Sequence, residues 1–62
     1  MWEKPKYLVV ETSALPEVFS RVMYAKHLIE SGQTGSFSDA AKRAEISRSA
    51  LYKYKDSVFS YE

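Results

Sequence analysis

The pattern of apolar and polar residues divides the chain into an N-terminal arm and three amphipathic segments. The first segment begins at Pro16, because proline is well suited to the first position of a helix. Gly32 is a good stop signal for the same helix. Between them, apolar residues recur at helical spacing and predict a helix over about 16–31; they are Val18, Phe19, Val22, Ala25 and Ile29.

Two shorter helices are predicted in the second half of the chain. Ser36 and Asp39 have the spacing of a capping box and predict a helix over about 37–44. Ser47 has the residue type of an N-cap and predicts a third helix over about 48–58. The second helix carries small residues that let a neighbouring helix approach closely; they are Ala40, Ala41 and Ala44.

The short break between these two helices predicts a helix-turn-helix unit. Two short helices joined by three or four residues cross steeply and share one small core. Such a core needs a small residue at the crossing, which Ala41 supplies, and an apolar residue in the turn, which Ile46 supplies. Leu51 and Tyr54, three residues apart, are the expected apolar anchors of the third helix.

The fold class expected from this pattern is all-α. We predict a small three-helix helix-turn-helix domain over residues 15–62, preceded by an extended N-terminal arm over residues 1–14. The arm contains Tyr7-Leu8-Val9-Val10, which has strand propensity but no second strand to pair with. We therefore expect it to lie on the helices or to pair with something outside this chain.

Glu45 departs from the residue expected in the turn. That position usually holds glycine because its backbone is left-handed, and a residue with a Cβ costs about 1 kcal/mol there. Either the turn is strained or its geometry differs from the usual one.

The distribution of charge distinguishes the second half of the chain from the first. The net charge of the whole chain is +1, which by itself argues against a polyanionic partner. From Lys42 to Lys55, however, five basic residues stand against one acidic residue, a net +4. Basic charge therefore gathers where the helix-turn-helix pattern lies.

The polar face of the third helix is the candidate nucleic-acid contact. Helical spacing places one stripe opposite Leu51; it consists of Arg48, Ser49, Tyr52, Lys53 and Asp56. Arginine and serine at the start of such a helix can bond base edges in the major groove. The predicted DNA-binding residues are Arg48 and Ser49 for bases, Tyr52 and Lys53 for phosphate or sugar, and Lys42 and Arg43 on the second helix for the backbone. The alternative is an ordinary solvated face.

The sequence offers few residues for other kinds of functional site. The absence of cysteine excludes disulfides and thiolate sites and is compatible with a cytoplasmic location. His27 is the single histidine and lacks a second ligand at metal spacing, and the two glycines do not form a phosphate loop. No apolar run reaches the length of a membrane span. We expect no catalytic residues, no cofactor, no metal and no membrane association.

A family resemblance supports this interpretation. Leu15-Pro16-Glu17, Asp39-Ala40-Ala41-Lys42 and above all the run from Ser47 to Phe59 resemble the N-terminal part of the PheB-type ACT-domain proteins of Firmicutes. The resemblance implies a further ACT domain C-terminal to this chain, which commonly binds amino acids and forms dimers. It thus implies the DNA-binding part of an amino-acid-responsive transcriptional regulator, with double-stranded DNA as partner and a homodimer formed through the ACT domain. Val58, Phe59 and Tyr61 near the end are as expected if another domain follows.

Two other functions stay open on the sequence alone. The chain could be a protein-interaction or oligomerisation module of an ACT-domain protein linked to aromatic amino-acid metabolism, which the near-neutral charge and the aromatic residues Trp2, Phe59 and Tyr61 favour. Members of the family also carry the label chorismate mutase. No residue of this chain supports that activity, and we expect no catalysis by it.

Overall fold

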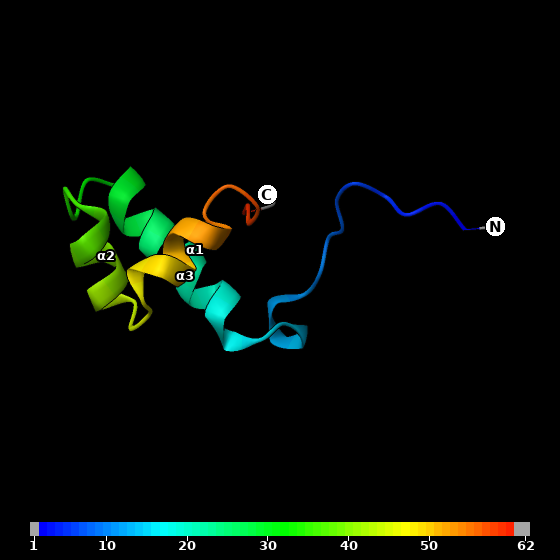
Figure 1. The fold of residues 1–62 in the computed structure, drawn as a ribbon, viewed down its shortest axis with the longest axis horizontal. Coiled ribbons are helices and arrows are strands. Elements are labelled where there is room, and N and C mark those ends of the chain that lie inside the picture. Colours follow the sequence, from blue (N-terminus) through cyan, green and yellow to red (C-terminus); the bar gives the residue numbers. More distant parts are fainter. Residues whose placement is uncertain (1, 61–62) are drawn as a thin grey trace.

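Residues 2–60 fold into three α-helices that follow an extended arm (Figure 1). The structure is a computed structural model and describes residues 2–60. A single 3-10 turn, Thr12–Ala14, precedes α1 (Glu17–Glu30), α2 (Phe37–Arg43) and α3 (Arg48–Tyr54). Residues 2–60 contain no strand, so the all-α prediction is confirmed. The end of the predicted 15–62 domain, with Tyr61, lies outside the described residues.

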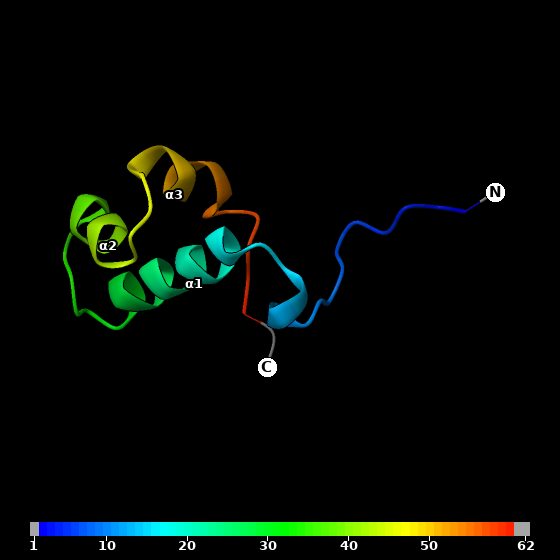
Figure 2. The ribbon, with the colours of Figure 1, turned by 90° about the horizontal axis from the view of Figure 1, so that it is seen from below.

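The two shorter helices, α2 and α3, pack on one side of α1 (Figure 2). It begins one residue after Pro16, which has extended backbone angles and precedes the helix rather than opening it. The predicted stripe is confirmed at its centre, where Val22 and Ala25 are fully buried. The pattern left out Leu28, which is also buried, near the C-terminal end of the helix.

The core between the helices is small and rich in alanine. Ala40, Ala41 and Ala44 of the second helix and its end are all buried, and they pack with Val22 and Leu51 in one cluster. Because alanine side chains are short, α2 can contact both α1 and α3 closely. Ile46, Tyr54 and Val58 pack partly buried against the same cluster. The positions that a helix-turn-helix core requires are therefore filled as the sequence predicted.

Helices α1 and α2 end in the same way, with different residues at the critical position. After α1, Gly32 takes the left-handed conformation (φ 78°), and Gln33 donates its backbone N–H to the Leu28 carbonyl. After α2, Glu45 takes the left-handed conformation (φ 59°), and Ile46 donates its N–H to the Ala41 carbonyl. Both are Schellman endings, in which the left-handed residue is most often glycine. The turn therefore has the usual geometry of the motif, and Glu45 bears its strain.

Helix α3 is shorter than predicted. It ends at Tyr54 and not near Val58. Beyond it the chain turns, and Ser57 and Val58 both donate their backbone N–H groups to the Tyr54 carbonyl. This bend brings Val58 back onto the core cluster, and the Lys26 ammonium on α1 donates to the Val58 carbonyl. The Lys26 ammonium thus supplies a partner for a carbonyl that lies beyond the end of the helix.

The N-terminal arm is extended, as predicted, and most of it stands away from the helices (Figures 1 and 2). Residues 2–10 contain no helix or strand and are all exposed. The strand propensity of Tyr7-Leu8-Val9-Val10 therefore remains unused. One side chain makes an aromatic contact with the helical body: the Tyr7 ring lies edge-on to Phe59, with centroids 6.2 Å apart.

Candidate nucleic-acid interface

Helix α3 separates an apolar inner face from a polar outer face. Ser47 caps it, because the Ser47 hydroxyl oxygen accepts the Ala50 backbone N–H at 3.1 Å. Leu51 is fully buried, and the Tyr54 ring packs edge-on against Phe19 with centroids 5.0 Å apart. The outer face is exposed throughout and carries the four predicted contact residues of α3: Arg48, Ser49, Tyr52 and Lys53. Asp56 is exposed as well but lies beyond the end of the helix.

Two of these outer side chains are held by the first turn of α2. Arg48 donates from Nη1 to the Ser38 hydroxyl oxygen at 2.9 Å. The Tyr52 ring, which is half exposed, lies against the Phe37 ring with centroids 5.2 Å apart. Adjacent residues of α2 thus contact residues on successive turns of α3. The exposed faces of the two helices consequently join into one surface.

Lys42 extends this surface, whereas Arg43 does not. Lys42 follows Ser38 by four residues, so it lies one turn along the same face of α2. Arg43 lies about 100° further around the helix, as 3.6 residues per turn require. Its Nε pairs with Asp39 at 2.9 Å, and its Nη1 donates to the Gln33 carbonyl at 3.4 Å. The structure therefore brings five of the six predicted residues together and ties Arg43 to the connection between α1 and α2.

Among the described residues, only some of the basic side chains near the joined surface lack an ion-pair partner. Within residues 2–60, Arg43 pairs with Asp39 and Lys55 with Asp56, so neither contributes an uncompensated charge. Among the same residues, no carboxylate pairs with the other three bases of this window, which are Lys42, Arg48 and Lys53. Lys53 lies 5.3 Å from the centre of the neighbouring Tyr54 ring, a contact that leaves its charge in solvent. The number of unpaired basic side chains in this window is therefore smaller than the sequence count suggested.

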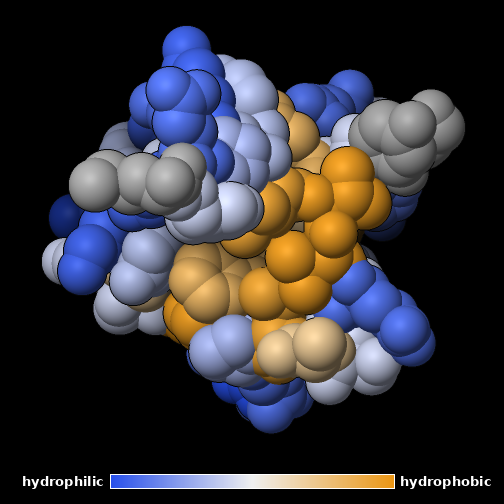
Figure 3. All heavy atoms as spheres, turned by 90° about the vertical axis from the view of Figure 1, so that its right-hand side faces the viewer, coloured by the Kyte–Doolittle hydropathy of each residue, from blue (hydrophilic) through white to orange (hydrophobic). Residues whose placement is uncertain are grey.

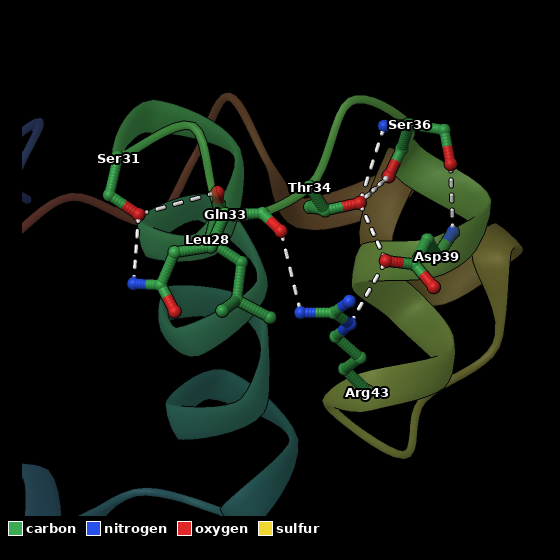
Figure 4. A network of polar contacts seen from close by, with 7 residues as sticks. All are labelled: Leu28, Ser31, Gln33, Thr34, Ser36, Asp39 and Arg43. Atoms are coloured by element: carbon green, nitrogen blue, oxygen red, sulfur yellow. Dashed lines mark hydrogen bonds and ion pairs between the residues drawn. The ribbon is translucent and has the colours of Figure 1, made fainter.

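The connection between α1 and α2 is held by a buried threonine, Thr34, which the sequence pattern did not indicate (Figure 4). The Thr34 hydroxyl donates to Asp39 Oδ2 at 2.7 Å, and the Ser36 hydroxyl oxygen accepts the Asp39 N–H at 3.1 Å. The capping-box prediction is therefore correct for Ser36 and wrong for Asp39. The Asp39 carboxylate binds Thr34 and Arg43, while the Ser36 N–H is directed at the Thr34 hydroxyl at 3.4 Å. The Thr34 hydroxyl lies between the Asp39 carboxylate and the Ser36 N–H, so these two groups do not bond directly as they would in a capping box.

Arg21 on α1 holds the turn between α2 and α3. Its Nη1 donates to the Glu45 carbonyl at 2.9 Å, and its Nη2 pairs with Glu17 one turn earlier in α1 at 3.0 Å. The strained Glu45 backbone is thereby fixed against α1. The i,i+4 spacing of Glu17 and Arg21 was visible in the sequence, but the bond to a carbonyl 24 residues away was not.

Other functional chemistry finds little support in the described part of the chain. His27 is exposed on α1. Among residues 2–60, no three His, Cys, Asp or Glu side chains gather closely enough to hold a metal ion. Within residues 2–60, none of the helices is sufficiently long and apolar to cross a membrane.

A second surface, at the base of the arm, is apolar (Figure 3). The arm, the start of α1 and the segment after α3 line an open groove of about 1120 Å³. Large side chains are strongly exposed around it, including Leu8 at 73%, Val9 at 76% and Phe59 at 59%. Phe59 is held in place by the Lys26 ammonium, 5.0 Å from its ring centre. An apolar surface of this kind is typical of a contact with another protein or domain.

The fold and the joined surface define a small helix-turn-helix domain with an exposed basic face. The chain is similar to proteins named UPF0735 ACT domain-containing protein. It is 51% identical to the one from Clostridium novyi over 55 residues, which cover 89% of this chain and 38% of that protein. It is 46% identical to the one from Clostridium kluyveri over 57 residues, with 92% and 39% covered. For the one from Caldicellulosiruptor saccharolyticus the identity is 49% over 55 residues, with 89% and 37% covered.

These relatives confirm the coarser part of the predicted resemblance, because clostridial homologues bear the name of ACT-domain proteins. The chain spans about two fifths of the length of the curated relatives it matches. Their names state no enzymatic activity, and they say nothing of DNA or of a PheB-type assignment. No family model matches the chain, and no solved structure matches it.

Proposed function

We propose that this chain binds double-stranded DNA through the joined surface of α2 and α3. The observation that carries the proposal is the juxtaposition of three unpaired cations with a serine and a tyrosine on one exposed face. Non-specific affinity for DNA comes from such cations, since each phosphate they neutralise releases counterions. Specificity comes from side chains that reach base edges.

The roles follow from position on the helices. Arg48 and Ser49, at the start of α3, would contact base edges in the major groove, where arginine recognises guanine bidentately. Tyr52 and Lys53, one turn further, would contact phosphate or sugar. Lys42 on α2 would contact the backbone beside the groove. Arg43 would reach phosphate only by leaving Asp39, so we assign it to the support of the fold.

A single copy makes few contacts, so its affinity should be low. Helix-turn-helix proteins commonly bind as dimers to half-sites about one DNA turn apart. We propose that the whole protein carries an ACT domain, which the names of the relatives support, and that this domain forms the dimer and binds an amino-acid effector. Such a regulator would act in the cytoplasm without catalysis by this chain.

The test is the salt dependence of binding to a labelled mixed-sequence duplex, measured by fluorescence anisotropy. With Lys42 and Lys53 on phosphates, the slope of log K against log salt should be about −2. Lys42→Ala should weaken binding to all sequences and reduce that slope by about 1.

Arg43→Gln is the matched control, because it removes the same charge from the next residue of α2. It should leave the slope unchanged, since Arg43 lies on another face and is already paired. Equal loss of slope for both variants would show that only total charge matters, and it would contradict the proposed surface.

The apolar surface at the base of the arm favours a second candidate function, that of a protein-interaction or oligomerisation module. Its contacts would be insensitive to salt, unlike those with DNA. Leu8→Ser combined with Val9→Ser should then abolish self-association measured by analytical ultracentrifugation while the helical circular dichroism is unchanged. A chain that is monomeric at millimolar concentration would count against oligomerisation through this surface.

A further inference from the structure

The first turn of α2 contacts the outer face of α3 at two points, through Ser38, which is exposed, and through Phe37, which also packs against the core cluster. Ser38 accepts a hydrogen bond from Arg48, and Phe37 packs on Tyr52. Ser38 is exposed and Phe37 is partly buried. Neither residue was among the contact residues predicted from the sequence.

We propose that Ser38 and Phe37 are positioning residues, which hold Arg48 and Tyr52 in the orientation in which they meet DNA. The inference rests on the proposed function and names residues that determine its specificity. An exposed arginine is normally free to adopt many rotamers, and ordering a rotamer-rich side chain opposes binding. A side chain that is already ordered in the free protein avoids that loss.

The hydrogen bond leaves Arg48 able to recognise a base. A guanidinium group has five N–H donors, of which the bond to Ser38 occupies one on Nη1. The edge formed by Nε and Nη2 remains open, and two parallel N–H groups on one edge are what bidentate contact with guanine requires. Ser38 therefore restricts the direction of Arg48 without using the donors that would read the base.

Phe37 acts on Tyr52 in a different way. The rings are tilted by 49° with centroids 5.2 Å apart, so Phe37 supports the Tyr52 ring while half of the residue stays exposed. A tyrosine supported in this way offers its hydroxyl to phosphate from a defined position. Arg48 and Tyr52 are one turn apart on α3, so the two supports orient one edge of the proposed contact surface.

The test compares wild type with Ser38→Ala on two duplexes, one selected from a randomised pool with wild-type protein and one scrambled. Ser38→Ala should reduce the ratio of the two affinities about two- to tenfold, the loss expected for one freed long side chain. Its affinity for the scrambled duplex and its salt slope should equal those of the wild type, because no cation is removed. Ser38→Thr, which keeps the hydroxyl, should restore the ratio.

A measurement on the free protein tests whether Ser38 orders the Arg48 side chain independently of DNA binding. In the free protein, ¹⁵N relaxation of the Arg48 Nε should show an ordered side chain that becomes mobile in Ser38→Ala. Equal discrimination by wild type and Ser38→Ala, or an Arg48 equally mobile in both, would overturn this inference and leave the proposed function standing. Absence of binding by the wild type to any duplex would overturn the proposed function and this inference with it.

Discussion

Replacing Glu45 with glycine should stabilise the protein, because Glu45 is held in a conformation that suits glycine. Its φ of 59° lies in the left-handed region, in the same Schellman position that Gly32 occupies after α1 with φ 78°. The substitution leaves the backbone carbonyl in place, so the bond from Arg21 is retained. The Glu45 side chain is exposed and makes no ion pair among the described residues.

The magnitude follows from two opposing terms. Left-handed backbone costs a residue with a Cβ about 1–2 kcal/mol, and glycine is released from that cost. Glycine loses about 0.5–1 kcal/mol more conformational entropy on folding. The net gain in the free energy of unfolding is therefore about 0.5–1 kcal/mol. In a domain of this size, that gain corresponds to a rise in Tm of roughly 3–6 °C.

Thermal unfolding followed by circular dichroism at 222 nm measures the effect. Glu45→Ala is the control, since it removes the carboxylate but keeps the Cβ, and its Tm should stay near that of the wild type. Gly32→Ala is the reciprocal change and should lower the Tm, because a Cβ there meets open space and only the backbone strain changes. A lower Tm for Glu45→Gly, or an equal rise for Glu45→Ala, would refute the assignment of strain to this turn.

Two further changes test the packing and the polar network. Leu51→Ala removes a fully buried side chain and should lower the free energy of unfolding by about 2–5 kcal/mol. Such a loss would unfold much of so small a domain at 37 °C. A Tm within a few degrees of the wild type would contradict the central place of Leu51 in the core. Thr34→Val keeps the volume but removes the bond to Asp39, and urea unfolding should show a loss of about 1 kcal/mol or more, with Thr34→Ser retaining most of the stability. No loss in Thr34→Val would show that the Asp39 carboxylate is satisfied equally well by Arg43 alone.

The helices could be predicted from the sequence because their determinants are local. The apolar period, the capping serines and the small residues of α2 act within a few positions, and Ser36 and Ser47 cap the helices as expected. The left-handed turn was recognised as a position for glycine although Glu45 occupies it. Each of these features depends on residue type and spacing alone.

The errors arise where distant residues compete with local preference. α3 ends at Tyr54, and beyond it Val58 packs on the core while Lys26, 32 residues earlier, binds its carbonyl. Asp39 does not complete the capping box because Thr34 intervenes. Helical spacing at neighbouring positions cannot reveal either contact.

The candidate site was predictable in its composition and not in its arrangement. The spacing of the α3 residues identified its exposed face. Lys42 lies on the same surface as the α3 residues, whereas Arg43 pairs with Asp39 on another face. This difference depends on where α3 crosses α2, and so does the hydrogen bond from Arg48 to Ser38. The angle between two helices is a product of packing, which the pattern of one helix does not contain.

The most direct test of the central claim is an NMR titration of the ¹⁵N-labelled chain with a short mixed-sequence duplex at low and moderate salt. The proposal predicts that chemical shifts change at the amides of Lys42, Arg48, Ser49, Tyr52 and Lys53, and that the changes fade as salt rises. Amides of the arm, such as that of Val9, should not move. An unchanged spectrum at low salt, where non-specific binding is strongest, would contradict DNA binding and leave the apolar surface as the functional one.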